Sequence, residues 1–256
     1  MRWRYLLSAP LPGPDNMALD DALLARAERS GEGVLRVYEW SQPTLSLGRN
    51  QPAAGRYDIE SAQALGITFV RRPTGGRAVL HCREITYSIT APTSAMGGLG
   101  DSYGRINRLL VDALRALGVS ATVSAPTGPS PLPGIAPCFE TPVAGEIEAG
   151  GRKLVGSAQV RQGLALLQHG SILVDDDQWL ASALLRDRTD APPRAATLRD
   201  SLGRAPSLHE VGDALRDALW RLESAEPLFL AADPELDTDM RAALTRYGDE
   251  RWTWRR

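Results

Sequence analysis

The chain has 256 residues, of which 43% are hydrophobic and 23% are charged, a composition typical of a globular protein with a substantial core. Its formal net charge is −2, so no overall positive field attracts it to nucleic acid, and no apolar run approaches the ~20 residues of a membrane helix. The presence of only two cysteines, Cys82 and Cys138, favours a reducing compartment such as the cytoplasm.

The first part of the chain predicts one long helix followed by strands. The helix is expected to begin at Asp15 or Asn16, either of which is a good N-cap, and to continue through "MALDDALLARAE". A short helix around "YDIESAQAL" is expected to end at Gly66. The strand-like runs are residues 34–40, 44–47 and 67–72, and strand resumes after a break at residues 75–76.

The second part begins with an amphipathic helix, "SYGRINRLLVDALRALG", which Gly118 closes. A loop rich in proline and glycine, "APTGPSPLPGIAPC", follows it. The segment "GEIEAGGRKLVGSAQV" predicts a hairpin that turns at Gly150 and Gly151, and "LALLQHGSILV" predicts another strand. Beyond Asp175 the pattern becomes helical, with Ser207 and Glu210 forming a capping box.

A largely β core followed by a helical tail predicts an α+β fold, with a mixed or antiparallel β-sheet and packed helices, rather than a doubly wound Rossmann fold. No G-x-G-x-x-G precedes a helix. We expect a single domain over residues 1–256, with its core at about 15–180 and a C-terminal helical extension at about 181–256.

Lys153 is the only lysine among 29 basic residues. In a strand it shares a face with Ser157 and Gln159, and the small residues Gly156, Ser157 and Ala158 would let a ligand or another backbone approach closely. One interpretation is a surface lysine near a turn. The other is that a compact ammonium is needed where a wide, planar guanidinium does not fit.

Cys138 is a candidate nucleophile because the preceding loop can present it at a surface. A free cysteine is more often a small buried hydrophobe, and an unperturbed thiol is only slightly ionised at neutral pH. A nearby lysine ammonium would lower its pKa and raise the reactive fraction. Cys82 lies in a strand-like run beside His81 and is the weaker candidate.

The stretch "RRPTGGRAVLH" places Gly75 and Gly76 after a strand, where two glycines permit close approach of the backbone to a ligand. A plain hairpin turn with basic flanks is the alternative. His81 and His169 are each open to a structural, hydrogen-bonding interpretation. The chain has no zinc-ligand spacing, no P-loop and no G-x-S-x-G elbow.

Five motifs occur in the order of a known family: "NMALDDALL", "PTLSLGRNQ", "RRPTGGRAVLH", "GRKLVGSAQVRQ" and "LQHGSILVD". Together they resemble the catalytic domain shared by lipoate-protein ligases, octanoyltransferases and biotin-protein ligases, a fold similar to class II synthetases. The loop "APCFETP" and a lysine 15 residues after its cysteine resemble the cysteine-dependent octanoyltransferases of Gram-positive type. The resemblance makes Cys138 the thioester nucleophile and Lys153 the group that depresses its pKa.

The resemblance implies octanoyl transfer from octanoyl-acyl carrier protein to a lysine of a lipoyl domain, such as glycine-cleavage H protein. It places Gly75, Gly76, Gly156, Ser157 and Ala158 along a slot for the acyl chain, with Arg72 and His81 beside it. No cofactor, metal, nucleic acid or membrane is expected to take part. Three alternatives stay open: an ATP-dependent lipoate-protein ligase, an amidotransferase between lipoyl domains, and a non-catalytic lipoyl-binding protein.

Overall fold

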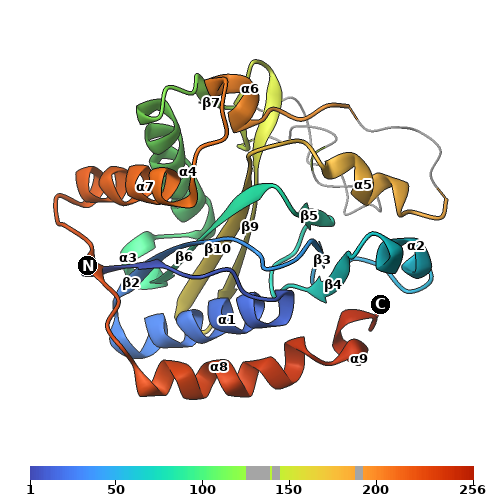
Figure 1. The fold of residues 1–256 in the computed structure, drawn as a ribbon. Coiled ribbons are helices and arrows are strands. Elements are labelled where there is room, and N and C mark those ends of the chain that lie inside the picture. Colours follow the sequence, from blue (N-terminus) through green and yellow to red (C-terminus); the bar gives the residue numbers. More distant parts are fainter. Residues whose placement is uncertain (125–138, 140–144, 188–192) are drawn as a thin grey trace.

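The computed structural model describes residues 1–124, 139, 145–187 and 193–256. In this part of the chain an eight-stranded sheet forms the centre of the molecule, with helices on both faces (Figure 1). Its order is β11-β1-β2-β6-β10-β9-β8-β7. The strands are β1 (Trp3–Leu7), β2 (Gly33–Tyr38), β6 (Glu84–Pro92), β7 (Ala121–Val123), β8 (Ile147–Ala149), β9 (Arg152–Gln162), β10 (Ala165–Leu173) and β11 (Leu228–Phe229). Because β1 pairs in parallel with β2 and β11 while the other pairs are antiparallel, the sheet is mixed, and the predicted α+β class is confirmed.

A second, three-stranded sheet has the order β4-β3-β5. It consists of β3 (Thr44–Leu47), β4 (Thr68–Arg71) and β5 (Val79–His81), and β3 has the predicted bounds. Its apolar side packs against α2 (Ile59–Ala64) and α5 (Gln178–Ala183) in a separate hydrophobic cluster. This small sheet lies beside the carboxyl-terminal end of β2 and forms one wall of the site described below.

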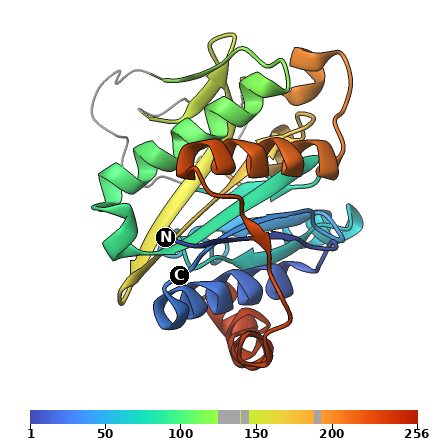
Figure 2. The same ribbon diagram turned by 90° about the vertical axis from the view of Figure 1, so that its left-hand side faces the viewer.

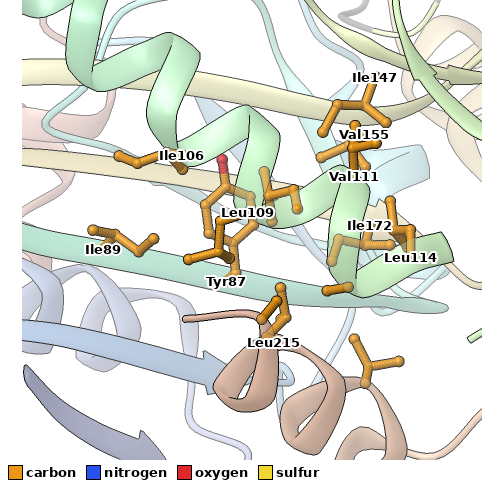
Figure 3. Packing of buried hydrophobic residues seen from close by; sticks show 14 of the residues in the cluster. Tyr87, Ile89, Ile106, Leu109, Val111, Leu114, Ile147, Val155, Ile172 and Leu215 are labelled. Carbon is orange, nitrogen blue, oxygen red and sulfur yellow. The ribbon is translucent and has the colours of Figure 1, made fainter. Parts of the chain in front are cut away.

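One face of the large sheet is covered by α4 (Leu99–Ala116) and α7 (Leu208–Glu223), which cross it side by side (Figure 2). The main core lies between them and the strands. Ile106 and Leu109 of α4 pack above Tyr87 and Ile89 of β6 (Figure 3). Each such side chain contributes roughly 1.5–3 kcal/mol when it leaves water, so this helical face secures the sheet on which the site is built.

The opposite face is covered by α1 (Gly13–Ser30), and α8 (Pro234–Tyr247) packs on the outer side of α1 (Figure 1). Leu236 of α8 joins Leu19 and Leu23 of α1 in one buried cluster. The remaining helices are α3 (Thr93–Met96), α6 (Leu198–Leu202) and α9 (Glu250–Thr253). No helix in the described ranges is long and apolar enough to cross a bilayer.

The first helix begins at Gly13, before either predicted N-cap. Pro14 occupies its first turn, where a missing N–H costs nothing because that group has no helical partner. The Asn16 amide instead donates to the backbone oxygens of Leu11 and Glu39, so the prediction of Asp15 or Asn16 as N-cap is wrong. The capping box of Ser207 and Glu210 is confirmed.

Candidate active site

A pocket with about 430 Å³ of empty volume, part of it open to solvent, lies where the small sheet meets β6, β9 and β10. Its walls come from both sheets and from the first turns of α1. The lining residues are Met17, Tyr38, Trp40, Ser46, Arg72, Gly76, Val79, His81, Thr86, Gly156, Ser157, Ala158, His169, Gly170 and Ser171. The pocket therefore combines an apolar wall with several convergent polar groups, as ligand sites commonly do.

The structure brings most of the predicted substrate-binding residues to this pocket. Arg72, Gly76, His81, Gly156, Ser157 and Ala158 all line it. Gly75 is not among the described residues that line it, and its carbonyl accepts a hydrogen bond from Arg72 Nη2 at 2.7 Å. Lys153 lies three residues before Gly156 on β9 and is likewise outside the lining set. Cys138 lies outside the residues that the structure describes.

Small residues let β9 and β10 lie close together under the pocket. Gly156, Ser157 and Ala158 pair with Ser171, Gly170 and His169, respectively. A Cβ on Gly170 would lie 2.5 Å from the Gly156 carbonyl oxygen and 2.8 Å from Ser157 Oγ, so only glycine fits there. The Ser157 hydroxyl is bonded to Tyr87 at 2.7 Å on the α4 side, whereas Val160 packs toward α1. Ser157 and Val160 therefore lie on opposite faces of β9, as predicted.

The loop between β4 and β5 approaches the end of β3 so closely that Gly48 cannot carry a side chain. A Cβ on Gly48 would lie 1.9 Å from the carbonyl oxygen of Gly76. Gly76 itself has φ +91°, a conformation that favours glycine. The loop backbone therefore forms part of the pocket wall directly, which agrees with the predicted close approach at "PTGG".

Arg72 is buried and holds this loop in place. Its Nη1 donates to the Ser46 carbonyl at 2.9 Å and the Ser46 hydroxyl at 3.2 Å, and its Nε donates to Thr74 Oγ1 at 3.2 Å. Its Nη2 donates to the carbonyls of Gly75 and Arg77, both at 2.7 Å. The planar fork of the guanidinium matches this set of acceptors, which an ammonium could not reach together.

His81 is fixed on both ring nitrogens. Nδ1 lies 3.1 Å from Glu84 Oε1 and Nε2 lies 2.8 Å from Ser46 Oγ, while Trp40 stacks on the ring at 4.0 Å between centroids. Burial lowers the pKa of His81, with the Glu84 carboxylate acting against this shift. A neutral ring beside a carboxylate carries its proton on Nδ1, so Nε2 accepts from the Ser46 hydroxyl.

His169 also lines the pocket, although the sequence did not mark it as a site residue. Its Nδ1 lies 3.0 Å from Asp20 Oδ2 and its Nε2 lies 2.7 Å from Thr74 Oγ1. Burial alone would raise the pKa of Asp20, but the hydrogen bond from His169 and the charge of Arg36 hold it below its ordinary value. Asp20 is therefore an ionised carboxylate inside the protein.

The two histidines thus belong to two similar chains, each running from carboxylate to imidazole to hydroxyl. Both hydroxyls, Ser46 and Thr74, also accept from Arg72. One buried guanidinium therefore fixes the orientation of both imidazoles at the pocket wall. Satisfied polar networks of this kind are rigid, because every member is costly to leave without a partner.

Lys153 is 2% exposed, so the interpretation as a surface lysine is wrong. Its ammonium is paired with the carboxylate of Glu146 and lies 4.9 Å from the centre of the Phe139 ring. Phe139 packs with Val79, which also lines the pocket. Lys153 is therefore a buried, paired cation.

Cys82 is exposed as a residue, but its sulfur is partly buried. This partial burial and the charge of Asp177 raise the pKa of its thiol. A raised pKa leaves less thiolate at neutral pH, so this cysteine is a poor nucleophile. Among the described residues, no group of three or more His, Cys, Asp or Glu side chains is arranged to hold a metal ion.

The sequence profile of the lipoyl protein ligase A/B catalytic domain matches residues 12–220. The chain is 38% identical over 276 residues to octanoyltransferase LipM of Kyrpidia tusciae, with 99% of each chain covered. It is 36% identical over 274 residues to octanoyltransferase LipM of Symbiobacterium thermophilum, covering 99% of this chain and 98% of that relative.

Two solved structures share the fold. A lipoate-protein ligase A bound with ATP has a TM-score of 0.82 at 24% identity, with 99% of both chains covered. A bi-partite lipoate protein ligase of Thermoplasma acidophilum, studied with its E2 lipoyl domain, has a TM-score of 0.79 at 22% identity and covers 99% of this chain and 96% of its own. At these identities the likeness concerns the fold.

Proposed function

This chain belongs to the lipoyl protein ligase A/B catalytic domain family and is an octanoyltransferase, and we propose that its reaction passes through an acyl thioester on Cys138. The observation that carries the proposal is the contact of the Lys153 ammonium with Phe139, the residue that follows Cys138 in sequence. This contact supports a functional pairing of Lys153 with Cys138. An ammonium favours the thiolate over the thiol and so lowers the pKa of a cysteine.

In the first half-reaction the Cys138 thiolate attacks the carbonyl carbon of octanoyl-acyl carrier protein. The bond between that carbon and the carrier's sulfur breaks, and the carrier leaves as a thiolate. In the second, the amine of an acceptor lysine attacks the Cys138 thioester, an amide forms, and Cys138 leaves as a thiolate. The proton lost by the amine neutralises the thiolate of the released carrier. Because the donor thioester is already activated for acyl transfer, no ATP is consumed.

Lys153 would act twice in this scheme. It would keep the Cys138 sulfur ionised, and it would stabilise the negative oxygen of each tetrahedral intermediate. One well-placed donor to such an oxyanion contributes about 3 kcal/mol to transition-state stabilisation. The carboxylate of Glu146 supports this role because it holds the ammonium at one position inside the protein.

The pocket is suited to the octanoyl chain. Met17, Trp40 and Val79 supply apolar surface, and Gly156 and Ala158 keep the floor free of bulky side chains. Each buried methylene contributes roughly 0.8 kcal/mol, so a medium chain brings several kcal/mol of binding free energy. The sequence predicted Arg72, Gly75, Gly76 and His81 as substrate-binding residues. We propose that Arg72, Gly76 and His81 shape the pocket, and that Gly75 belongs to the loop that supports it.

We propose a lysine of a lipoyl domain as the acceptor, with glycine-cleavage H protein as the specific example. Support comes from the family, in which one structural relative is a lipoate protein ligase described together with its E2 lipoyl domain. The donor is octanoyl-acyl carrier protein.

Mass spectrometry tests the thioester. The protein is mixed with octanoyl-acyl carrier protein without ATP, digested, and searched for octanoyl on each cysteine. We expect the label on Cys138, its retention in Cys82→Ser, and its loss in Cys138→Ser with the fold intact. Three results contradict the proposal: product only from free octanoate with ATP, labelling only by an octanoylated lipoyl domain, and binding of octanoate without any covalent adduct.

A further inference from the structure

The C-terminal residues lie beside the small sheet (Figure 1). Four arginines from three separate segments come together there. The arginine cluster consists of Arg49, Arg71, Arg255 and Arg256. Arg255 Nη2 donates to the Arg49 carbonyl at 2.6 Å, and Arg71 Nη1 donates to the same carbonyl at 3.4 Å. The Arg256 carbonyl accepts from the backbone of Ala53 and Ala54 at 2.8 and 2.7 Å. Hydrogen bonds therefore hold the backbone segments that carry these arginines in place.

In the described part of the chain, no carboxylate side chain forms an ion pair with any of the four members of the arginine cluster, and Asp21 acts on Arg49 only through its charge at longer range. The nearby Asp21 and Asp249 are paired with other arginines. Burial and the charges of Arg255 and Arg256 lower the pKa of Arg71 to about 10. Since the whole chain has a formal charge of −2, this concentration is local.

Arg255, an exposed member of the cluster, is held in a defined position. The guanidinium of Arg255 lies 3.8 Å from the centre of the Trp252 ring, and its Nη2 is bonded as described above. Ordering an arginine costs side-chain entropy, while bringing like charges together costs Coulomb energy. A negatively charged surface placed against the cluster relieves the Coulomb repulsion, and little further entropy is lost at Arg255 because that side chain is already ordered.

The arginine cluster is linked directly to the pocket wall. The Arg49 N–H donates to the Thr74 carbonyl at 2.8 Å, and Thr74 is two residues before the pocket-lining Gly76. Gly48, the residue before Arg49, is in van der Waals contact with Gly76. A partner bound on the cluster therefore lies next to the loop that forms one side of the acyl pocket.

We propose that the arginine cluster is the docking surface for an acidic face of the carrier protein that delivers the octanoyl thioester. This inference rests on the proposed function, in which donor and acceptor visit the enzyme in turn. The donor is assigned to the cluster because it must insert the acyl chain beside the loop of Thr74 and Gly76, whereas the acceptor brings only a lysine side chain.

The two half-reactions can be measured separately, which isolates the donor. Arg49→Glu and Arg255→Glu are compared with the protein in its original sequence for acylation by octanoyl-acyl carrier protein, with no acceptor present. We expect kcat/KM for acylation to fall roughly tenfold through a raised KM, and the dependence of the rate on salt to weaken. With octanoyl-N-acetylcysteamine, an uncharged thioester, the variants should react at the unchanged rate.

Arg108→Glu is the matched control, because it makes the same charge reversal at an exposed position of α4, away from the small sheet. It should not change the rate with either donor. Equal slowing of both donors by Arg49→Glu would show that the cluster only supports the pocket. Slowing confined to transfer from pre-acylated enzyme to the lipoyl domain would assign the cluster to the acceptor. Unchanged acylation by the carrier would exclude docking there.

A binding measurement keeps the inference separate from the thioester chemistry. Fluorescence titration with carrier protein that bears no acyl group reports docking whether or not Cys138 becomes acylated. We expect weaker binding by Arg49→Glu and Arg255→Glu and unchanged binding by Arg108→Glu. Failure of labelling at Cys138 with this binding pattern intact would overturn the proposed mechanism alone, while equal binding by all variants would overturn the docking surface alone.

Discussion

Gly48 and Gly76 are in such close contact that the backbone of one occupies the space where the other would need a side chain. A Cβ on Gly48 would meet a carbonyl oxygen, which belongs to the main chain and cannot turn aside as a flexible side chain could. We expect Gly48→Ala to displace the loop at Gly76 and to lower the free energy of unfolding by about 1–3 kcal/mol.

The acylation rate should fall together with stability in this variant. Gly75→Ala is the control, because a Cβ at Gly75 meets no atom within 4 Å. Denaturant unfolding and the acylation rate check both variants. A Gly48→Ala protein with unchanged stability and rate would contradict the close contact.

Arg72→Lys tests whether one guanidinium orders the pocket. Lysine retains the charge but cannot reach the carbonyls and hydroxyls that Arg72 bonds, so buried acceptors lose their donors. Each buried group left without a partner costs about 1–3 kcal/mol, so a loss of roughly 3 kcal/mol of stability is expected. The ring proton resonances of His81 and His169 should both shift. A change at one histidine alone would argue against a shared anchor.

The lowered pKa of His81 predicts how stability depends on pH. In the unfolded chain the ring takes up a proton near its ordinary pKa of 6.5, whereas in the folded protein burial keeps it neutral to lower pH. The contribution is therefore complete above pH 6.5 and is lost as pH falls toward the folded pKa, by up to about 1.4 kcal/mol per pH unit.

Denaturant titrations over this pH range measure the slope. His81→Gln should reduce the slope, because this ring then no longer takes up a proton on unfolding. If the free energy of unfolding changes equally with pH in the unsubstituted protein and in His81→Gln, this pH dependence does not come from His81.

Lys153→Arg tests the need for a compact cation. A guanidinium retains the charge but would have to place a wider, planar group in the buried position beside Glu146 and Phe139, so we expect acylation to slow at least 100-fold. The thiol pKa can be followed through the rate of alkylation by iodoacetamide against pH, in a Cys82→Ser background that removes the other thiol. We expect the pKa of the remaining thiol to rise in Lys153→Ala. An unchanged alkylation profile would separate Lys153 from Cys138.

Local patterns were sufficient to predict much of the fold. The bounds of β3, the turn at Gly150 and Gly151 and the capping box of Ser207 each depend on a few neighbouring residues, and all are confirmed. The predicted start of α1 was wrong because the Asn16 side chain donates hydrogen bonds to the carbonyls of Leu11 and Glu39 and does not cap its own helix. The two-residue strand β11 is too short to have a periodicity.

The site was predictable only in part, because several of its residues depend on contacts between segments far apart in the sequence. Gly76, Gly156 and Ala158 are marked by small size within strand-like sequence, and they line the pocket. His169 could not be identified because its partner Asp20 is 149 residues away on α1. The pairing of Glu146 with Lys153 crosses an irregularity between β8 and β9, so no regular register indicates it.

Arg72 both closes the loop and anchors two imidazoles, so substitutions near the pocket would affect the stability of the folded protein as well as the site. Changes near the pocket would first reduce the amount of folded protein and only then the turnover of each molecule, because chaperones and proteases remove marginally stable chains. Natural variation in substrate preference is therefore expected to be accompanied by compensating changes elsewhere in the fold, for instance in the packing of α4 and α7.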